Sequence, residues 1–455
     1  MACALALAPT LNPASHAPAA AVQPPAGTLA AEIRARLAAR DDEGLGAIYA
    51  VRGYRPIWID AAGPTPAAHL LAAKLARARD DGLRPADYDA QAIGRALRHA
   101  RSPGALAELD LRLSRAYGRY AIDLTQPPAP AALVATDPDV ARARRTPAAA
   151  LAAALRAPSL LAHLQGLTPQ NPVYQGLRAA LAAYRAARPR DAPPDGYEEA
   201  LALNLARARA LPPDADARFV LVDAASAQLW LYEDGKVAAT MPVAVGTVKD
   251  PTPMISGVIR YAAYHPYWYV PPDLARESYA PLALKDGPAA LTAAGLEVLS
   301  DWTDQAVVID PASVDWQAVA DGRELVRLRQ RPGPDNMMGQ LKLMLPNGFG
   351  VYLHDTPNHR VFDHAARNFS HGCVRLSDAR RLARLLGAPP PADDAGAPEE
   401  RVDLPEPTPV YIAYFTARPD HGRIAFAPDV YHRDAPLLAA LDERPVGAAT
   451  QLAAR

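Results

Sequence analysis

The sequence predicts an α+β protein in which an N-terminal helical domain is followed by a β-rich, β-sandwich-like domain with an inserted capping segment. A length of 455 residues favours more than one domain. Between about residues 28 and 210, apolar residues recur at three- and four-residue spacing, which is typical of amphipathic helices. From about Arg218 onward the pattern changes to an alternation rich in Val, Leu and aromatic residues, which favours strands.

These patterns divide the chain into segments. The predicted segments are a leader remnant or disordered linker at 1–27, a helical scaffold domain at 28–212, a β-rich domain at 216–435 with an inserted cap or lid at 271–346, and a C-terminal tail at 436–455. Residues 1–27 contain a short apolar stretch and many small residues, but no basic residue precedes Arg34. Two interpretations therefore stay open: the end of a leader that starts upstream, and a plain disordered terminus.

Three helices are predicted to begin at a proline that follows a hydroxyl residue. The pairs are Thr65-Pro66, Ser102-Pro103 and Thr146-Pro147. A hydroxyl side chain caps free N–H groups, and proline at the first helical position loses no hydrogen bond. The core of this helical domain is expected to contain its aromatic residues, which are Tyr49, Tyr54, Trp58, Tyr117 and Tyr120. No catalytic cluster is apparent in it.

The β-rich part opens with a predicted hairpin. Asp234-Gly235 lies between two alternating runs and suits a type I′ turn, because both residues tolerate a positive φ. Within the predicted insert, PPDLARESYAPLAL is expected to be helical and ELVRLRQ extended. A last strand pair is expected around a turn at Asp420 to Gly422.

Composition excludes several classes of protein. The 48 Lys and Arg residues balance 49 Asp and Glu residues, so no basic stripe indicates nucleic-acid binding. No apolar run approaches the roughly 18 residues that span a bilayer. The two cysteines are Cys3, inside the leader-like segment, and Cys373, so a disulfide framework is excluded. Nothing in the sequence indicates an oligomeric state.

The residues around Cys373 carry the chemical signal. Phe349, Val351 and Leu353 alternate, so His354 is expected at the open end of a strand. Ser370-His371-Gly372-Cys373 follows on a glycine-containing loop. If residues 373–376 are extended, Cys373 and Arg375 face one way and Val374 and Leu376 face the core. Ser377 is predicted to cap a helix that ends at Gly387.

This arrangement suits nucleophilic thiol chemistry. A nearby arginine and a helix N-terminus favour the reactive thiolate, and a histidine can take its proton. Backbone N–H groups of Gly372 and Cys373 can hold an oxyanion, since glycine permits close approach. Two alternatives remain: an inert core cysteine, and a zinc site, which the irregular spacing of the histidines disfavours.

Ser370-His371-Gly372-Cys373-Val374-Arg375, preceded by His354, resembles the signature of the YkuD-type L,D-transpeptidase domain. Roughly residues 40–440 are similar to the large Gram-negative members of that family, which have an N-terminal scaffold domain. The similar stretches are YHPYWYVPPDLARES, DPASVDW, ELVRLRQRPGPDNMMGQLKLMLPN, HDTP and PVYIAYFTA. The chain departs from those members between AAYRAARPR and YEEALALNLARAR, where it leaves no room for their small peptidoglycan-binding-like module.

The resemblance implies a fold and a reaction. A β-sandwich-like catalytic domain follows the helical scaffold, and a mobile cap covers the active site. The cysteine attacks the bond between the meso-diaminopimelate at position three of a peptidoglycan stem peptide and the terminal D-Ala. An amine of a second stem then resolves the thioester into a 3→3 cross-link. The resemblance further implies no metal and no organic cofactor, acylation of the thiol by carbapenems, and a location in the periplasm or cell envelope.

The resemblance implies a role for each residue that occupies a position of the family's motif. The resemblance implies catalytic roles for Cys373 as nucleophile and His354 as base, with His371 in support. It implies oxyanion and substrate-binding roles for Gly372, Arg375, Ser370 and Tyr352. Three alternatives stay open: an L,D-carboxypeptidase in which water resolves the thioester, an enzyme that anchors proteins to the wall, and a non-catalytic wall-binding scaffold. The intact Cys373, His354 and Arg375 disfavour the last of these.

Overall fold

The structure, a computed structural model, describes residues 26–40, 42–189, 192–391 and 396–443. The described chain forms two compact units. The first contains residues up to Ala76, Tyr88–Arg119 and Pro147–Leu164, and the second contains Arg77–Asp87, Tyr120–Thr146 and everything from Gln165 onward. The predicted order of a helical region followed by a β-rich region is confirmed. The predicted leader remnant lies almost wholly outside the described residues.

The first unit is built from helices. They are α1 (Ala26–Ala38), α2 (Glu43–Val51), α3 (Pro66–Ala76), α4 (Ala90–His99), most of α5 (Pro103–Thr125), α6 (Pro147–Leu155) and α7 (Leu160–Gln165), with the short strands β1 (Ile59–Asp60) and β2 (Gly63–Pro64). The three predicted proline starts are confirmed at α3, α5 and α6. Thr65 Oγ1 and Ser102 Oγ accept N–H groups of the first turns of α3 and α5 at 3.2 and 3.3 Å.

The core of the first unit gathers around the middle of α5. Tyr49 and Trp58 are fully buried, and both hydrogen-bond to Ser114 Oγ, at 2.7 and 2.8 Å. The buried carboxylate of Asp110 accepts the backbone N–H of Trp58 at 2.7 Å. Tyr117 is buried here as predicted, and Tyr120 is buried as predicted but belongs to the second unit. Tyr54 stays half-exposed in a left-handed backbone conformation with φ of 60°.

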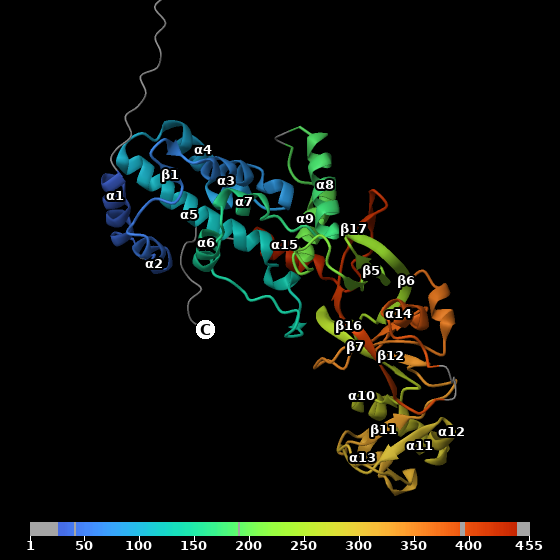
Figure 1. The fold of residues 1–455 in the computed structure, drawn as a ribbon. Helices are drawn as coiled ribbons and strands as arrows, with labels where there is room; N and C mark the ends of the chain where they lie inside the picture. The colour runs from blue at the N-terminus through green and yellow to red at the C-terminus, as the bar shows by residue number, and fades with distance from the viewer. Residues whose placement is uncertain (1–25, 41, 190–191, 392–395, 444–455) are drawn as a thin grey trace, which may run out of the picture. The chain divides into compact units, whose positions relative to one another are not determined.

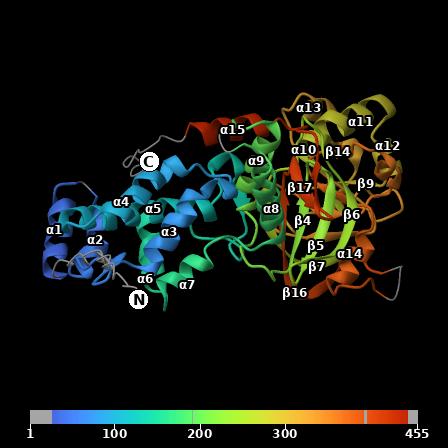
Figure 2. The ribbon, with the colours of Figure 1, turned by 90° about the horizontal axis from the view of Figure 1, so that it is seen from above.

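The second unit is organised by one large mixed sheet of ten strands. The strand order is β12-β13-β15-β6-β5-β4-β16-β7-β3, with β14 paired to β6. An additional pairing of β12 with β7 joins two distant points of this path, so the sheet curves back on itself. Strands β4, β5 and β6 run side by side in Figure 2. Their bounds are β3 (Ala135–Thr136), β4 (Phe219–Asp223), β5 (Gln228–Glu233), β6 (Lys236–Gly246), β7 (Ile255–Tyr264), β12 (Leu341–Met344), β13 (Leu353–His354), β14 (Asn368–Ser370), β15 (Val374–Leu376) and β16 (Glu400–Ala413).

Two predicted turns are confirmed. Asp234 and Gly235 have φ of 49° and 73° and join β5 to β6, as a type I′ turn requires. His421 and Gly422 have φ of 45° and 79° and join β17 (Ala417–Asp420) to β18 (Arg423–Phe426). In both hairpins the positive φ matches the twist of the flanking strands, so local sequence chemistry sets the register.

Several helices of the second unit flank the sheet. α8 (Pro172–Ala186) and α9 (Gly196–Ala208) contact β17, although the sequence groups them with the preceding helices. The two helices on either side of the Pro-rich break pack against each other. Residues 436–442 of the predicted tail belong to α15 (Asp434–Asp442), where Leu437 is fully buried against α9. Residues 444–455 lie outside the described residues.

The predicted insert forms a small core of its own between the paired strands β7 and β12 (Figure 1). Its strands are β8 (Trp268–Tyr269), β9 (Leu296–Leu299), β10 (Val308–Ile309) and β11 (Arg327–Gln330), in the order β10-β9-β11-β8, and its helices are α10 (Pro272–Leu274), α11 (Ala280–Asp286), α12 (Ala289–Ala293) and α13 (Trp316–Ala320). This core extends from Trp268 to Met338, whereas residues 341–344 belong to the main sheet. Its bounds therefore differ by a few residues from the predicted 271–346.

Candidate active site

A parallel strand pair brings four of the predicted site residues to one face. Leu353 pairs with Val374 and His354 pairs with Arg375, and the N–H of Val374 donates to the carbonyl of Tyr352 at 2.9 Å. Leu353 and Val374 are fully buried in the core, as the predicted alternation requires. Side chains alternate along a strand, so Tyr352, His354, Cys373 and Arg375 share the opposite face.

The turn before Cys373 is held by a serine. Ser370 Oγ donates to the carbonyl of Cys373 at 2.5 Å and accepts the N–H of Gly372 at 3.2 Å. Gly372 has φ of +102°, a conformation that L side chains rarely adopt, so glycine is required here. Ser370 itself is 2% exposed. In this structure Ser370 contacts the backbone of the loop, and the oxyanion or substrate-binding role that the resemblance implies for it stays a prediction.

Cys373 is half-buried, and its surroundings favour the protonated thiol. Burial raises its pKa above the usual value, against the opposing effects of the Tyr352 backbone N–H and the Arg375 guanidinium. Sγ donates to the carbonyl of Gly350 at 3.6 Å. In the part of the chain that the structure describes, Nε of Arg375 is buried without a hydrogen-bond partner. A guanidinium in that state is a ready partner for an anion.

His354 ends β13 and is 4% exposed. Its Nδ1 lies 2.5 Å from the carbonyl of Asp355, which can only accept, so Nδ1 carries the proton. Burial, followed by the charge of Arg375, lowers the pKa of His354 to about 3, so the ring is neutral at physiological pH. Of the hydrogen bonds between described residues, none joins this ring to Cys373 Sγ. Catalytic hydrogen bonds commonly tighten only when substrate binds.

His371 is placed differently from His354. Its ring is about half-exposed, and Nδ1 lies 3.1 Å from Oδ2 of Asp250. The helix after the loop, α14 (Ala379–Leu385), begins one residue later than predicted. Asp378, rather than Ser377, is its N-cap, because Oδ1 of Asp378 accepts the N–H of Arg381 at 2.9 Å. Ser377 instead donates its backbone N–H to the carbonyl of Pro242 at 3.2 Å.

Comparison with known proteins finds two matching domains in this chain. Residues 217–412 match the family model of the L,D-transpeptidase catalytic domain of the YkuD type, and residues 43–181 match that of the scaffold domain. The chain contains a catalytic domain of the L,D-transpeptidase family, preceded by a scaffold domain. All of the predicted site residues lie within the matched catalytic domain.

A curated relative is similar over part of its length. The chain is 32% identical over 246 residues to a Haemophilus influenzae protein named "Putative L,D-transpeptidase", and the match covers 51% of this chain and 48% of that protein. The chain thus spans about half the length of this curated relative. Solved structures similar to it include an L,D-transpeptidase from Mycobacterium smegmatis, with 16% identity, coverage of 43% and 58% and a TM-score of 0.22. Another is LD transpeptidase LdtMt1 in complex with imipenem, with 16% identity, coverage of 44% and 59% and a TM-score of 0.21.

Two charged residues beside the candidate site, Lys342 and Glu399, lie outside the sequence motif. Lys342 pairs in register with His354 across β12 and β13, so the two side chains share a face. Its ammonium is buried and lies 2.9 Å from Oε1 of Glu399 and 5.8 Å from the ring centre of Tyr352. Burial, with the charges of Cys373 and Glu399 next, raises the pKa of Tyr352. Only the alternating pattern of LKLM, which turns Lys342 away from the core, hints at this pair.

No helix in the described part of the chain has the length and hydrophobicity needed to cross a bilayer. Among the described residues, no three His, Cys, Asp or Glu side chains gather as metal ligands would. The expectation that catalysis needs no metal stays a prediction.

The raised thiol pKa predicts the pH dependence of alkylation. In a Cys3→Ser background, the rate of iodoacetamide alkylation of Cys373 should keep rising beyond about pH 8.5, because only the thiolate reacts. The rate is measured by mass spectrometry between about pH 6 and 10. The same protein in denaturant, where the thiol is solvated, serves as the control and should titrate at lower pH. A plateau already reached near pH 6 would instead indicate a resting thiolate–imidazolium pair.

Proposed function

We propose that this protein forms 3→3 cross-links between peptidoglycan stem peptides through a thioester on Cys373. The observation that carries this proposal is the single face shared by the Cys373 thiol, the neutral His354 ring, Tyr352 and the Arg375 guanidinium. A nucleophile, a base and a cation for a substrate carboxylate are the groups that such an acyl transfer needs.

In the first half-reaction, His354 accepts the thiol proton as Sγ attacks the carbonyl of the bond between diaminopimelate and D-Ala. The resulting oxyanion faces the backbone N–H of Cys373, since the N–H of Gly372 already donates to Ser370 Oγ. Collapse breaks the C–N bond, and D-Ala leaves with the proton from His354. The unpartnered Nε of Arg375 suits a carboxylate of the donor stem.

In the second half-reaction, the side-chain amine of a second stem attacks the thioester. His354 removes the proton of this amine and returns it to the departing Sγ, which regenerates the thiol. The acceptor stem is proposed to approach along the face that contains Lys342 and Glu399. The carboxylate of Glu399 suits the side-chain ammonium group of that stem before this group loses its proton. Because the proposed substrate lies outside the inner membrane, we place the protein in the periplasm or cell envelope.

The insert between β7 and β12 is proposed to form a wall or lid of this site. Its Tyr269 ring centre lies 6.0 Å from the Lys342 ammonium, so the base of the insert reaches the face that carries His354. The strand pairing of Tyr269 with Arg329 keeps this aromatic residue on a regular element. A segment in this place can exclude water and so favour an amine over hydrolysis.

Purified muropeptides test the acceptor. Incubation of tetrapeptide monomers with the protein should give dimers that have lost one D-Ala, detected by mass spectrometry. Shortened monomers without dimers would replace the cross-linking proposal with an L,D-carboxypeptidase. No change in the muropeptides, with intact protein confirmed by circular dichroism, would contradict both.

A further inference from the structure

Thr252 lies buried behind the loop that carries the nucleophile. Its side chain is 0% exposed. Oγ1 accepts the N–H of Gly246 at 2.8 Å and donates to the carbonyl of Gly372 at 2.9 Å. A hydroxyl has a single proton, and here that proton is directed at Gly372. The threonine therefore connects the end of β6 to the turn before Cys373.

The carbonyl that Thr252 holds belongs to the same peptide group as the N–H of Cys373. In a trans peptide these two groups point in opposite directions, and no cis peptide occurs among the described residues. Glycine allows this peptide to rotate more freely than any other residue would. Fixing the Gly372 carbonyl at Thr252 therefore fixes the direction of the Cys373 N–H, which the proposed mechanism uses at the oxyanion.

Thr252 is itself held from the C-terminal side of the domain. Arg433 donates from its guanidinium to the carbonyl of Thr252 at 3.2 Å. Tyr431 donates its hydroxyl to the carbonyl of Gly246 at 2.6 Å, and the same oxygen lies 3.5 Å from the Thr252 N–H. A Cβ on Gly246 would meet the carbonyl of Asp250 at 2.1 Å, so this loop closes tightly on itself.

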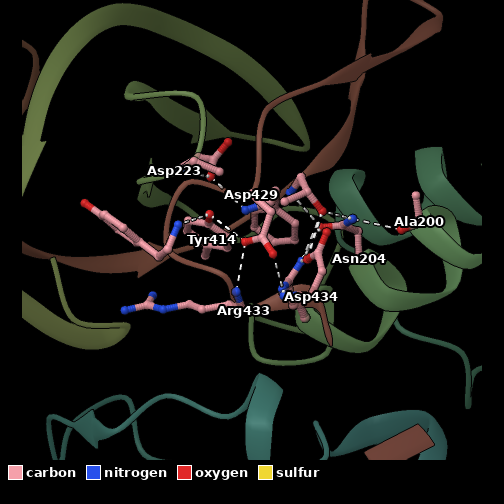
Figure 3. Close-up of polar contacts among 12 residues, drawn as sticks. Ala200, Asn204, Asp223, Tyr414, Asp429, Arg433 and Asp434 are labelled. Carbon is pink, nitrogen blue, oxygen red and sulfur yellow. Dashed lines mark hydrogen bonds and ion pairs between the residues drawn. The ribbon is translucent and has the colours of Figure 1, made fainter. Parts of the chain in front are cut away.

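A polar network fixes these two side chains in turn (Figure 3). Asp429 accepts the hydroxyl of Tyr414 at 2.8 Å and the backbone N–H groups of Arg433 and Asp434, each at 2.9 Å. The Asp434 carboxylate pairs with the buried guanidinium of Arg207 on α9 at 2.6 Å. The rings of Tyr414 and Tyr431 stack at 5.3 Å. The support behind Thr252 thus extends over β16, residues 429–434 and α9.

We propose that Thr252 is the positioning residue for the oxyanion donor of Cys373, and that Tyr431 and Arg433 brace it. The inference rests on the proposed function, because it assigns a role in the same acyl transfer. The proposal predicts that loss of Thr252 affects two reactions of the Cys373 thiol differently. Acylation by a carbapenem passes through an oxyanion, whereas alkylation by iodoacetamide displaces iodide at a saturated carbon and needs no oxyanion donor.

The test compares both second-order rates in a Cys3→Ser background. Thr252→Val keeps the shape of the side chain but loses both hydrogen bonds. It should lower the carbapenem acylation rate roughly 10–100-fold and leave the alkylation rate within about threefold of the parent. Thr252→Ser restores the hydroxyl and should recover acylation to within about threefold. Thr408→Val, at a threonine with 1% exposure whose Oγ1 bonds to the Glu406 carbonyl, should leave both rates unchanged.

Equal losses in acylation and alkylation for Thr252→Val would overturn the proposal, since they would indicate general collapse of the loop. Unchanged acylation would overturn it as well. If Thr252→Val does not fold, Tyr431→Phe removes the hydroxyl that holds Gly246, and a selective loss of acylation is again required. A parent protein that no carbapenem acylates would contradict the proposed function itself, which is a different result from an insensitive Thr252 variant.

Discussion

Cys373→Ser is expected to abolish covalent reaction with carbapenems. The parent protein should gain the mass of one drug molecule, and the variant should gain none. The physical reason is that a serine hydroxyl is far less acidic and less nucleophilic than a thiol, so the same surroundings do not activate it. Intact-protein mass spectrometry after incubation with the drug measures the result directly.

Cys3→Ser is the matched control for this variant, because Cys3 is the other thiol of the chain. It should keep full adduct formation at an unchanged rate. An adduct on Cys373→Ser would show that another side chain carries the covalent chemistry. Peptide mapping of the acylated parent locates the drug independently, and it should fall on the peptide that contains Cys373.

His354→Ala is expected to slow carbapenem acylation by roughly 10²–10⁴-fold, the usual contribution of a general base. His371→Ala should cost less. His354 is buried at the end of β13, and its carbonyl partner at Asp355 orients the ring. His371 is half-exposed and pairs with Asp250, so its ring is directed by a group outside the strand pair. Acylation rates by stopped-flow or mass spectrometry separate the two variants.

Folding of both histidine variants is checked by thermal unfolding, since His354 is buried and His371 is not. A larger loss for His371→Ala than for His354→Ala would reverse the assignment of the base and leave the cysteine mechanism intact. Asp250→Asn offers a further comparison, because it weakens the partner of His371 without touching His354. Its effect on acylation should resemble that of His371→Ala.

Local signals in the sequence predict local structure well in this protein. Pro66, Pro103 and Pro147 mark true helix starts, because φ at proline is fixed wherever the chain goes. Asp234-Gly235 marks a true hairpin for a similar reason. The facing of Cys373 and Arg375 follows from the period of a strand. Ser377 and Asp378 are both residue types that can cap a helix, and the cap is whichever of them stands directly before the first helical residue. The composition of the segment does not determine where the backbone becomes helical.

The sequence does not predict the contacts between segments that lie far apart along the chain. Thr252 lies 120 residues from Gly372, and no motif links the two. Lys342 and Glu399 pair across 57 residues and meet only because β12 and β7 close the sheet. In the sequence, α8 and α9 cannot be distinguished from the helices before them, although they belong to the second unit. Amphipathic spacing indicates that one face of a helix is buried, but it does not indicate which element packs on that face. Their place in the second unit follows from their tertiary contacts with β17.

The parallel pairing of β13 with β15 constrains the two strands and the segment that connects them to different degrees. Register places His354 beside Arg375, and a shift by one residue would turn Cys373 into the core and Val374 out to solvent. The connection over residues 357–366, which precedes β14 and the turn at Gly372, carries no such register constraint, because pairing at the flanking strands, rather than the length of this segment, brings the histidine and the cysteine together. Insertions and deletions in this loop should therefore accumulate among descendants of this gene, while a single-residue change inside either strand should be lost.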